Sequence, residues 1–338
     1  MITASDFICI PYTPDLTEGG ISYACRSLPH TYDRMGGSPF DRLRRIVVGV
    51  SVELAFRRYL TQQNTPFDVR GVTPFTEPDR YDVSLGGHRC DIKSFLISYR
   101  EQIASIQADP ARLLDAPGLV PLDQYSAEGR SGGDLYLFAF LTGLIAVSPA
   151  DLQKATMAGM PIYLIHTMPP AWLRPHAWIP LGLVLKSESD EALTVEIGGQ
   201  DAAREFVTYG VELPPRTRLS IEADFHSLAY IHVKSRPEAR LGIHSRTRRE
   251  TYIVQPVEWS NIWVYGMRIY LAGWITRDEF RQRANLLQEG SRVFQYDRTR
   301  TRNLAVPISD LRPLSELLSR VRAWKESESN AAGRSIAS

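Results

Sequence analysis

The chain has 338 residues, of which 43% are hydrophobic and 23% are charged, an ordinary globular composition with room for two domains. Its formal net charge is +1, so no overall basic field indicates nucleic-acid binding, and such binding would depend on local patches. The first fifteen residues lack the pattern of a signal peptide, no apolar run is long enough to span a bilayer, and the three cysteines form no Cys-x-x-Cys pair. These features favour a cytoplasmic protein without a disulfide framework or a zinc cage.

Residues 1–37 are rich in Pro, Gly, Thr and Tyr, which predicts an irregular arm with one short strand near residues 7–10. A helix is then expected from Ser38 to about residue 60, because Ser is a good N-cap and the following Pro suits the first helical position. Apolar residues at helical spacing form one stripe on it, namely Leu43, Val47, Val50 and Leu54. Glu53 lies on the flank of this stripe, where an ion pair with Arg57 four residues later is the ordinary alternative to a functional role.

Residues 81–95 predict a β-hairpin whose turn is Gly86-Gly87. Side chains of a strand alternate between its two faces, so Asp91 and Lys93 should point the same way and Ile92 the other way. Pairing across the hairpin brings Asp82 to the same region. Two carboxylates suit a Mg²⁺ ion, and a lysine beside such an ion can orient or deprotonate water or stabilise negative charge. The alternative is a solvated ion pair of little energetic value.

The spacing Asp-x8-Asp-x-Lys resembles the PD-(D/E)xK nuclease superfamily, the fold of many restriction endonucleases and junction resolvases. Tyr81 stands where the family usually has Pro. The resemblance implies that Asp82 and Asp91 are metal ligands, that the carbonyl of Ile92 completes the coordination, and that Lys93 is catalytic. It further implies that Glu53 on the preceding helix is a direct or water-mediated metal ligand. The implied cofactor is Mg²⁺, with Mn²⁺ as a substitute.

Two later segments set the expected domain boundaries. Residues 134–141 are a nearly continuous apolar strand, suited to the centre of a covered sheet. Residues 268–276 predict another strand, followed by a helix with Thr276 and Glu279 as a capping box. In the family that this chain resembles, such strands follow one another closely, whereas here about 120 residues separate them. The resemblance therefore implies a nuclease core of residues 38–141 and 262–325, interrupted by an inserted domain of residues 142–261.

The expected insert begins with a helix over residues 150–157. Short strands separated by turn residues then predict a small β-sandwich or barrel, with strands near 161–166, 181–186, 193–197, 206–213, 216–221 and 230–233. His226 and His232 lack ligand spacing and are interpreted as surface or core residues. Three tryptophans could stack on bases or pack in the core, namely Trp172, Trp178 and Trp259. The basic cluster that includes Arg246 and Arg248 is either a phosphate contact or a solvated loop.

A second basic segment follows a helix expected over residues 280–287. Arg298, Arg300 and Arg302 alternate with other residues, and in an extended segment they would share one face suited to phosphate binding. The alternative is an exposed loop of charge-balancing arginines. A last helix is expected over residues 314–324, followed by a disordered tail over residues 326–338.

Taken together, these features predict an α/β protein with a restriction-endonuclease-like mixed sheet flanked by helices and interrupted by a β-rich domain. The expected function is Mg²⁺-dependent endonucleolytic hydrolysis of DNA phosphodiester bonds, and analogy places it in restriction or antiviral defence. The expected partner is DNA, and no association with a membrane is expected. The sequence leaves two alternatives for assembly, namely a homodimer and a complex with a partner subunit of a defence system. One rival is a catalytically inactive, nucleic-acid-binding adaptor of the same fold. Another is a carbohydrate- or protein-binding module centred on the insert.

Overall fold

The protein is mixed α/β and contains several sheets. The computed structural model describes residues 2–27, 39–69, 82–126, 131–145, 148–158, 162–262 and 265–324. The chain divides into two compact units. Unit 1 comprises Met1–Gly20, Arg45–Leu144 and Gly266–Ser338, and unit 2 comprises Ile21–Arg44 and Ile145–Tyr265. Among the described helices, none is both long enough and apolar enough to cross a membrane.

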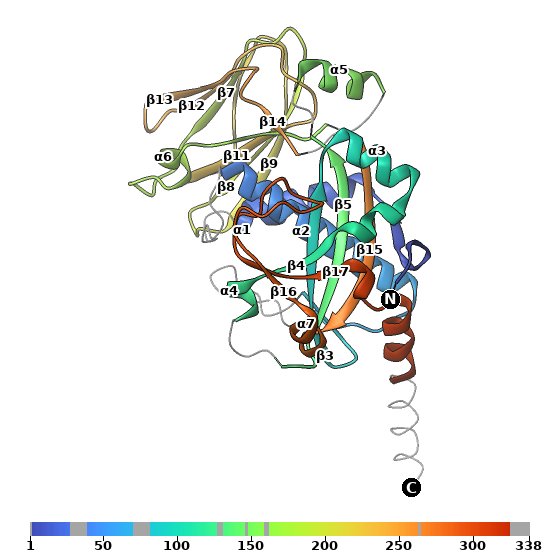
Figure 1. Ribbon diagram of the computed structural model, residues 1–338. Coiled ribbons are helices and arrows are strands. Elements are labelled where there is room, and N and C mark those ends of the chain that lie inside the picture. Colours follow the sequence, from blue (N-terminus) through green and yellow to red (C-terminus); the bar gives the residue numbers. More distant parts are fainter. Residues whose placement is uncertain are drawn as a thin grey trace. The chain divides into compact units, whose positions relative to one another are not determined.

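A five-stranded mixed sheet forms the centre of unit 1 (Figure 1). Its strands lie in the order β1 (Ile8–Pro11), β15 (Tyr265–Thr276), β5 (Leu135–Leu144), β3 (His88–Ile97) and β2 (Val83–Leu85). β3 and β5 are parallel, whereas β2 pairs antiparallel with β3 and β1 antiparallel with β15. Every residue of β5 is buried, which confirms the central strand that its apolar run predicts.

The predicted hairpin is present as β2 and β3, with Val83 opposite Cys90 and the two glycines in the turn. Gly86 has φ 55° and Gly87 has φ 77°, the left-handed conformations that a tight two-residue hairpin turn requires and that glycine adopts without strain. Tyr81 lies outside the described residues. The turn therefore determines which residues of β3 face which side of the sheet.

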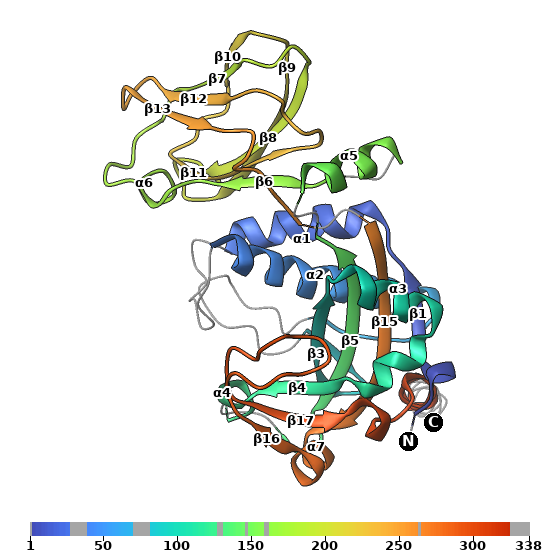
Figure 2. The ribbon, with the colours of Figure 1, turned by 45° about the horizontal axis from the view of Figure 1, so that its top comes forward.

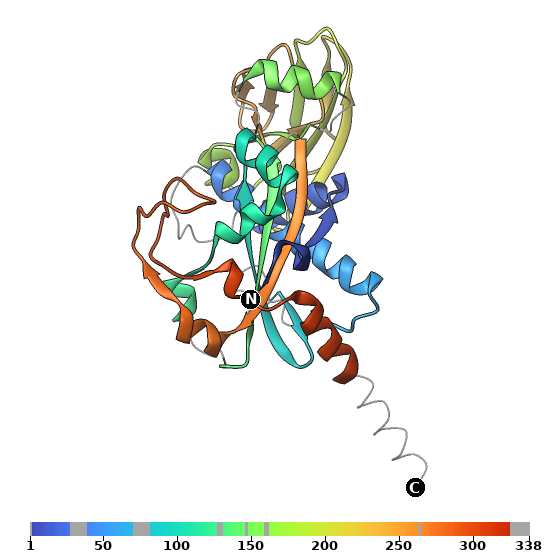
Figure 3. The same cartoon turned by 45° about the vertical axis from the view of Figure 1, so that its right-hand side comes forward.

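Different elements cover the two faces of the main sheet. Helix α2 (Pro39–Gln62) covers one face, where a Cβ atom on Gly49 would lie 3.8 Å from the hydroxyl of Ser94. Helix α3 (Arg100–Ala108) and a three-stranded sheet lie on the other side (Figure 3). This small sheet has the order β16 (Asn285–Leu287), β17 (Asn303–Pro307) and β4 (Pro117–Pro121). The aromatic rings of Phe95, Phe138 and Phe280 fill the space beneath it.

Several local expectations need correction. The short strand expected near residues 7–10 is present as β1, but the rest of the stretch expected to be an irregular arm contains helix α1 (Pro14–Ser27). The Pro- and Gly-rich stretch after α3 contains β4, which pairs with β17 along its whole length. The predicted capping box of Thr276 and Glu279 is present, but α7 (Arg277–Arg283) ends early and Asn285–Leu287 is a strand, because pairing with β17 replaces the helical hydrogen bonds. The remaining short elements of unit 1 are η1 (Ala4–Asp6), η2 (Pro110–Asp115), α4 (Leu122–Tyr125), η3 (Ile308–Asp310) and a helix over residues 314–324.

Unit 2 contains two antiparallel sheets that share one apolar core (Figure 2). One sheet has the order β10 (Arg218–Ser220), β7 (Leu183–Ser187), β12 (Leu241–Ser245) and β13 (Glu250–Val254). The other has the order β14 (Ser260–Asn261), β6 (Leu164–Thr167), β11 (Ser227–Val233), β8 (Leu193–Gln200) and β9 (Phe206–Leu213). Along β7, buried residues alternate with more exposed ones, as expected for a strand with one face in a sandwich core.

The helix predicted near the start of the insert is α5 (Pro149–Met157), which begins at the N-cap Ser148. A second short helix, α6 (Pro170–Leu173), places Trp172 in the core. Strands β12, β13 and β14 are additions to the strands that the sequence predicts. The predicted disordered tail of residues 326–338 and the predicted N-cap Ser38 lie outside the described residues.

Candidate active site

A buried ion pair lies on β3 at the position where the sequence predicts chemistry. Lys93 Nζ lies 2.7 Å from Asp91 Oδ1, and each of the two side chains is only 12% exposed. The two residues share one face of β3, while Ile92 between them is buried on the opposite face. Because a buried ion pair seldom stabilises a fold more than apolar packing does, this pair is a candidate for a functional role.

Asp82 lies where the regular pairing of β2 with β3 ends. Its Oδ2 accepts a hydrogen bond of 2.6 Å from the backbone N–H of Ile92, and its own N–H donates to the carbonyl of Cys90 over 3.2 Å. Burial raises the pKa of the Cys90 thiol well above its ordinary value, and the negative charges of Asp82 and Asp91 raise it further. Both carboxylates are therefore close enough to the buried Cys90 thiol to raise its pKa.

The backbone of Ile92 adds a further oxygen to this region. In a β-strand, the N–H and the C=O of one residue point to the same side of the strand. Since the N–H of Ile92 is directed at Asp82, its carbonyl oxygen is directed to the same side, beyond the end of β2. Two carboxylates and one carbonyl are hard oxygen donors of the kind that Mg²⁺ prefers. The donor set of Asp82, Asp91 and the Ile92 carbonyl thus fits a Mg²⁺ ion chemically, although the described residues contain no group of three His, Cys, Asp or Glu side chains that could hold a metal.

Glu53 is connected to the Asp82 segment from helix α2. It lies one turn after Gly49, the residue of α2 that faces Ser94 of β3. Its Oε2 is 3.5 Å from Arg57, and the same Arg57 side chain donates a 2.9 Å hydrogen bond to the carbonyl of Asp82. Glu53 thus supports the backbone of the Asp82 segment through Arg57, as the predicted i,i+4 partner of that arginine.

Gln124 on α4 is brought to the site by a contact that the sequence did not predict. Its Oε1 accepts a 2.9 Å hydrogen bond from Lys93 Nζ. The two residues are 31 positions apart, so no spacing in the sequence could indicate that they meet. Helix α4 is itself anchored at both ends, by the hydrogen bond from Leu122 N to Arg302 O and by the bond from the Arg277 guanidinium to Tyr125 O.

The arginine loop, residues 288–302, connects β16 to β17. The sequence predicts an extended segment near its end, but the loop is a series of turns and bends. The expected alternation is nevertheless present, because Arg298, Arg300 and Arg302 are exposed while Thr299 is buried. Several side-chain hydrogen bonds hold the loop, namely Thr299 to Gln288 O, Tyr99 to Asp297, Gln102 to Phe294 O and Gln295 to Pro117 O.

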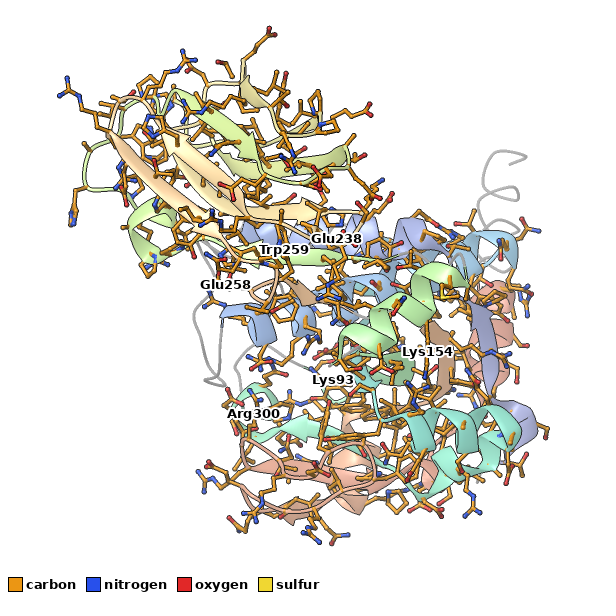
Figure 4. The ribbon with its side chains drawn as sticks, turned by 90° about the horizontal axis from the view of Figure 1, so that it is seen from above. Lys93, Lys154, Glu238, Glu258, Trp259 and Arg300 are labelled. Carbon is orange, nitrogen blue, oxygen red and sulfur yellow. The ribbon has the colours of Figure 1, made fainter. Side chains whose placement is uncertain are left out.

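One ring contact connects the arginine loop with the face that carries Lys93; Lys93 and Arg300 are labelled in Figure 4. The ring of Tyr296 meets the ring of Phe95, two residues after Lys93, edge to face at 6.2 Å. Burial raises the pKa of Tyr296, and the charges of Arg45 and Arg300 oppose that rise, which places Arg300 near the tyrosine. The loop therefore presents Arg300 beside the face that carries the ion pair.

The other predicted nucleic-acid contacts lie in unit 2, in the turn between β12 and β13. Arg246 donates to the hydroxyl of Ser220, and Arg248 lies over the ring of Trp172 and 3.7 Å from Glu250. Both arginines thus have partners within their own unit, in keeping with the solvated-turn alternative.

The histidines and tryptophans of unit 2 lie mostly in its interior. His226 and His232 are buried, in accord with their interpretation as core or surface residues. Trp172 and Trp259 are buried as well, whereas Trp178 is half-exposed and lies beneath the guanidinium of Arg204. Comparison of the chain with protein-family models, with curated proteins and with solved structures yields no match.

Proposed function

We propose that the protein is a Mg²⁺-dependent nuclease that hydrolyses phosphodiester bonds of DNA, with a restriction-endonuclease-like core in unit 1. The observation that carries the proposal is the buried pair of Asp91 and Lys93 on the central sheet, next to the hairpin end where Asp82 binds the backbone of Ile92. The order of elements supports it, since helix α2 is followed by the hairpin, by helix α3 and by the parallel neighbour β5.

Each residue of the site has a role in this proposal. Asp82, Asp91 and the carbonyl of Ile92 would hold Mg²⁺ or Mn²⁺, which when bound supplies a Lewis acid for the phosphoryl oxygen and lowers the pKa of a bound water. Lys93 keeps its ammonium beside Asp91, where it can orient the attacking water and stabilise the charge that develops on the phosphorane.

The arginine loop supplies the substrate contact in this proposal. Arg298, Arg300 and Arg302 are exposed on a loop that is held in place by its own hydrogen bonds, so binding of a phosphate backbone would order few additional side chains. A role in bacterial restriction or antiviral defence, with a second copy or another subunit as partner, follows from analogy with the fold alone.

A second function is favoured by the position of Glu53. Since Glu53 pairs with Arg57, the site could belong to an adaptor that binds nucleic acid without cutting it. Calorimetric titration of Mg²⁺ and Mn²⁺ separates the two functions. The nuclease requires binding that is abolished in Asp82→Asn, whereas the adaptor requires DNA binding without a metal-dependent reaction.

The deciding experiment is cleavage of plasmid, phage and single-stranded DNA by wild-type protein and by Lys93→Met, with Mg²⁺, Mn²⁺ or EDTA. Lys186→Met is a matched control, because Lys186 forms a surface ion pair with Glu188 and its side chain is 49% exposed. We expect cutting by the wild-type protein to require metal. It should disappear in Lys93→Met and persist in Lys186→Met. Cutting by Lys93→Met at the wild-type rate would refute the assignment.

A further inference from the structure

The ammonium group of Lys93 has two of its three hydrogens already engaged. It contacts Asp91 Oδ1 at 2.7 Å and Gln124 Oε1 at 2.9 Å, and it makes no further hydrogen bond within the described part of the chain. An ammonium has three donors in a tetrahedral arrangement, so fixing two of them also fixes the direction of the third. With Asp91 alone, the group could still rotate about the axis of a single hydrogen bond.

The side chain of Gln124 can meet Lys93 in only one orientation. A lysine ammonium only donates, so the amide oxygen of Gln124 must face it and the amide nitrogen must point elsewhere. Within the described residues this nitrogen makes no hydrogen bond. Gln124 is half-buried, and α4, which carries it, is anchored by the backbone hydrogen bond from Leu122 to Arg302 and by the Arg277 guanidinium, which donates to the carbonyl of Tyr125.

We propose that Gln124 is a positioning residue, which fixes the rotation of the Lys93 ammonium and thereby directs its remaining N–H at the scissile phosphate. The catalytic part of this role rests on the proposed nuclease function. The fixed geometry of the ammonium is independent of that function. The backbone bond from Leu122 to the carbonyl of Arg302 connects the same short helix to the arginine loop. The segment that orients Lys93 is therefore attached directly to the segment that would bind the phosphate backbone.

The first test is single-turnover DNA cleavage by the full chain with Mg²⁺, comparing wild type, Gln124→Leu and Gln124→Glu. Gln124→Leu removes the acceptor with little change in volume, and we expect kcat to fall about 10- to 100-fold, because a catalytic group that is slightly misdirected costs rates of this order. KM for DNA should change less than about threefold, since Lys93 still carries its charge. Gln124→Glu keeps an oxygen at the same place and should retain kcat within about fivefold of wild type.

A matched control addresses the stability of α4. Ser126→Ala removes the hydrogen bond from the Ser126 hydroxyl to Leu122 O without touching Lys93, and it should leave kcat unchanged. Equal losses in Gln124→Leu and Ser126→Ala would mean that only the helix matters and would overturn the proposal. Equal losses in Gln124→Leu and Gln124→Glu would also overturn it, because the amide N–H rather than the oxygen would then be required.

The second test does not depend on activity. The chain contains five lysines, namely Lys93, Lys154, Lys186, Lys234 and Lys325, so side-chain ammonium signals in nitrogen-15 NMR can be assigned by the loss of one signal in Lys93→Met. A fixed ammonium exchanges its hydrogens slowly and gives a visible signal. We expect this signal in wild type and in Gln124→Glu and its loss in Gln124→Leu. Absence of DNA cleavage by wild type would defeat the proposed nuclease, and the NMR signal alone would then decide whether Gln124 positions Lys93.

Discussion

The two units of the chain treat buried polar side chains differently. In unit 1, the Lys93 ammonium is buried in an ion pair and still has a hydrogen without a partner among the described residues. In unit 2, both ring nitrogens of the buried His166 are occupied, since Nδ1 lies 3.2 Å from Glu258 O and Nε2 lies 2.9 Å from the hydroxyl of Tyr252. Burial alone therefore does not distinguish a reactive group from a structural one.

The tautomer of His166 follows from its partners. A carbonyl oxygen can only accept, so Nδ1 carries the hydrogen that goes to Glu258 O, and Nε2 accepts from the hydroxyl of Tyr252. The ring also contacts Trp259 at 6.2 Å between ring centroids. All of its hydrogen-bonding capacity is used within unit 2, whereas in the proposed nuclease the remaining hydrogen of Lys93 is available to a substrate. This difference predicts opposite outcomes when the two residues are replaced.

The largest effect is expected from loss of the ion pair in unit 1. Lys93→Ala or Asp91→Ala should lower the rate of metal-dependent cleavage by about 10³-fold or more, because in the proposed nuclease each removes a group that acts on the reacting phosphate or its metal. Quantitative cleavage assays measure this loss. Each single variant also breaks the ion pair, and breaking a buried pair costs about 3–5 kcal/mol in known cases.

A double variant controls for that instability. Asp91→Asn combined with Lys93→Met leaves no unpaired charge, so it should unfold closer to the wild-type temperature while remaining inactive. If the double variant is stable and cuts DNA at the wild-type rate, the pair of Asp91 and Lys93 has no part in cleavage. Its difference from the structural His166 would then be refuted.

The second effect concerns the arginine loop. Replacing Arg298, Arg300 and Arg302 together by Gln should weaken DNA binding about 10-fold or more at low salt, and the slope of log affinity against log salt should fall by about one for each phosphate that the protein no longer neutralises. Fluorescence anisotropy over a series of salt concentrations measures both. A matched triple replacement removes the same charge from arginines in exposed surface ion pairs, namely Arg216, Arg240 and Arg281. Equal weakening in both triple variants would show that net charge, rather than this loop, governs binding.

The third effect tests the structural side of the comparison. His166→Phe removes both hydrogen bonds of the ring and leaves the hydroxyl of Tyr252 and the carbonyl of Glu258 without it, so we expect a loss of about 2 kcal/mol in the stability of unit 2. Thermal unfolding followed by tryptophan fluorescence measures the loss, because Trp259 contacts the ring. The exposed His176→Phe should change stability by less than about 0.5 kcal/mol. A cleavage rate that falls with His166→Phe while the protein stays folded would assign unit 2 a part in the reaction.

Local patterns predicted much of the fold. Gly86-Gly87 and the alternation around it predict the hairpin, and the apolar run of residues 135–141 predicts the buried central strand. Both signals depend on neighbouring residues only. The strand Pro117–Pro121 escaped prediction because its pairing partner lies almost two hundred residues later, and two prolines at its ends suggest a loop. Interactions across long stretches of sequence leave no local pattern.

The candidate site shows the same limit. Alternation along one strand predicts that Asp91 and Lys93 share a face, and the structure places their side chains in contact. The face on which Glu53 would lie could not be predicted, because helical spacing does not tell which side of the sheet the helix covers. The contact of Gln124 with Lys93 could not be predicted, since it joins two elements that only the tertiary fold brings together.

The smallest effect concerns the carboxylate of Glu279 in unit 1, which, like the ring of His166, is held by hydrogen bonds from other parts of the protein. Burial acts to raise the pKa of Glu279, but hydrogen bonds from the side chain and backbone of Thr276 and the ion pair with Arg312 outweigh it, so the pKa is lowered. A carboxyl whose pKa is lower in the folded state stabilises the fold above its unfolded pKa of 4.5, and that contribution disappears as pH falls through the folded value.

Glu279→Gln should therefore cost about 1 kcal/mol at pH 7, typical of a missing cap, and progressively less as pH falls below 4.5 and wild-type Glu279 becomes protonated. Denaturant unfolding at pH 7 and at a series of pH values below 4.5 measures the difference. Asp278→Asn on the same helix removes an exposed charge and should have a smaller effect at pH 7. We expect metal-dependent cleavage by Glu279→Gln to match wild type once both proteins are folded. A loss of activity without a loss of stability would mean that Glu279 acts in the site although its carboxylate is already bound by Thr276 and Arg312. Full hydrogen bonding within the protein would then not distinguish a structural group from a functional one in this chain.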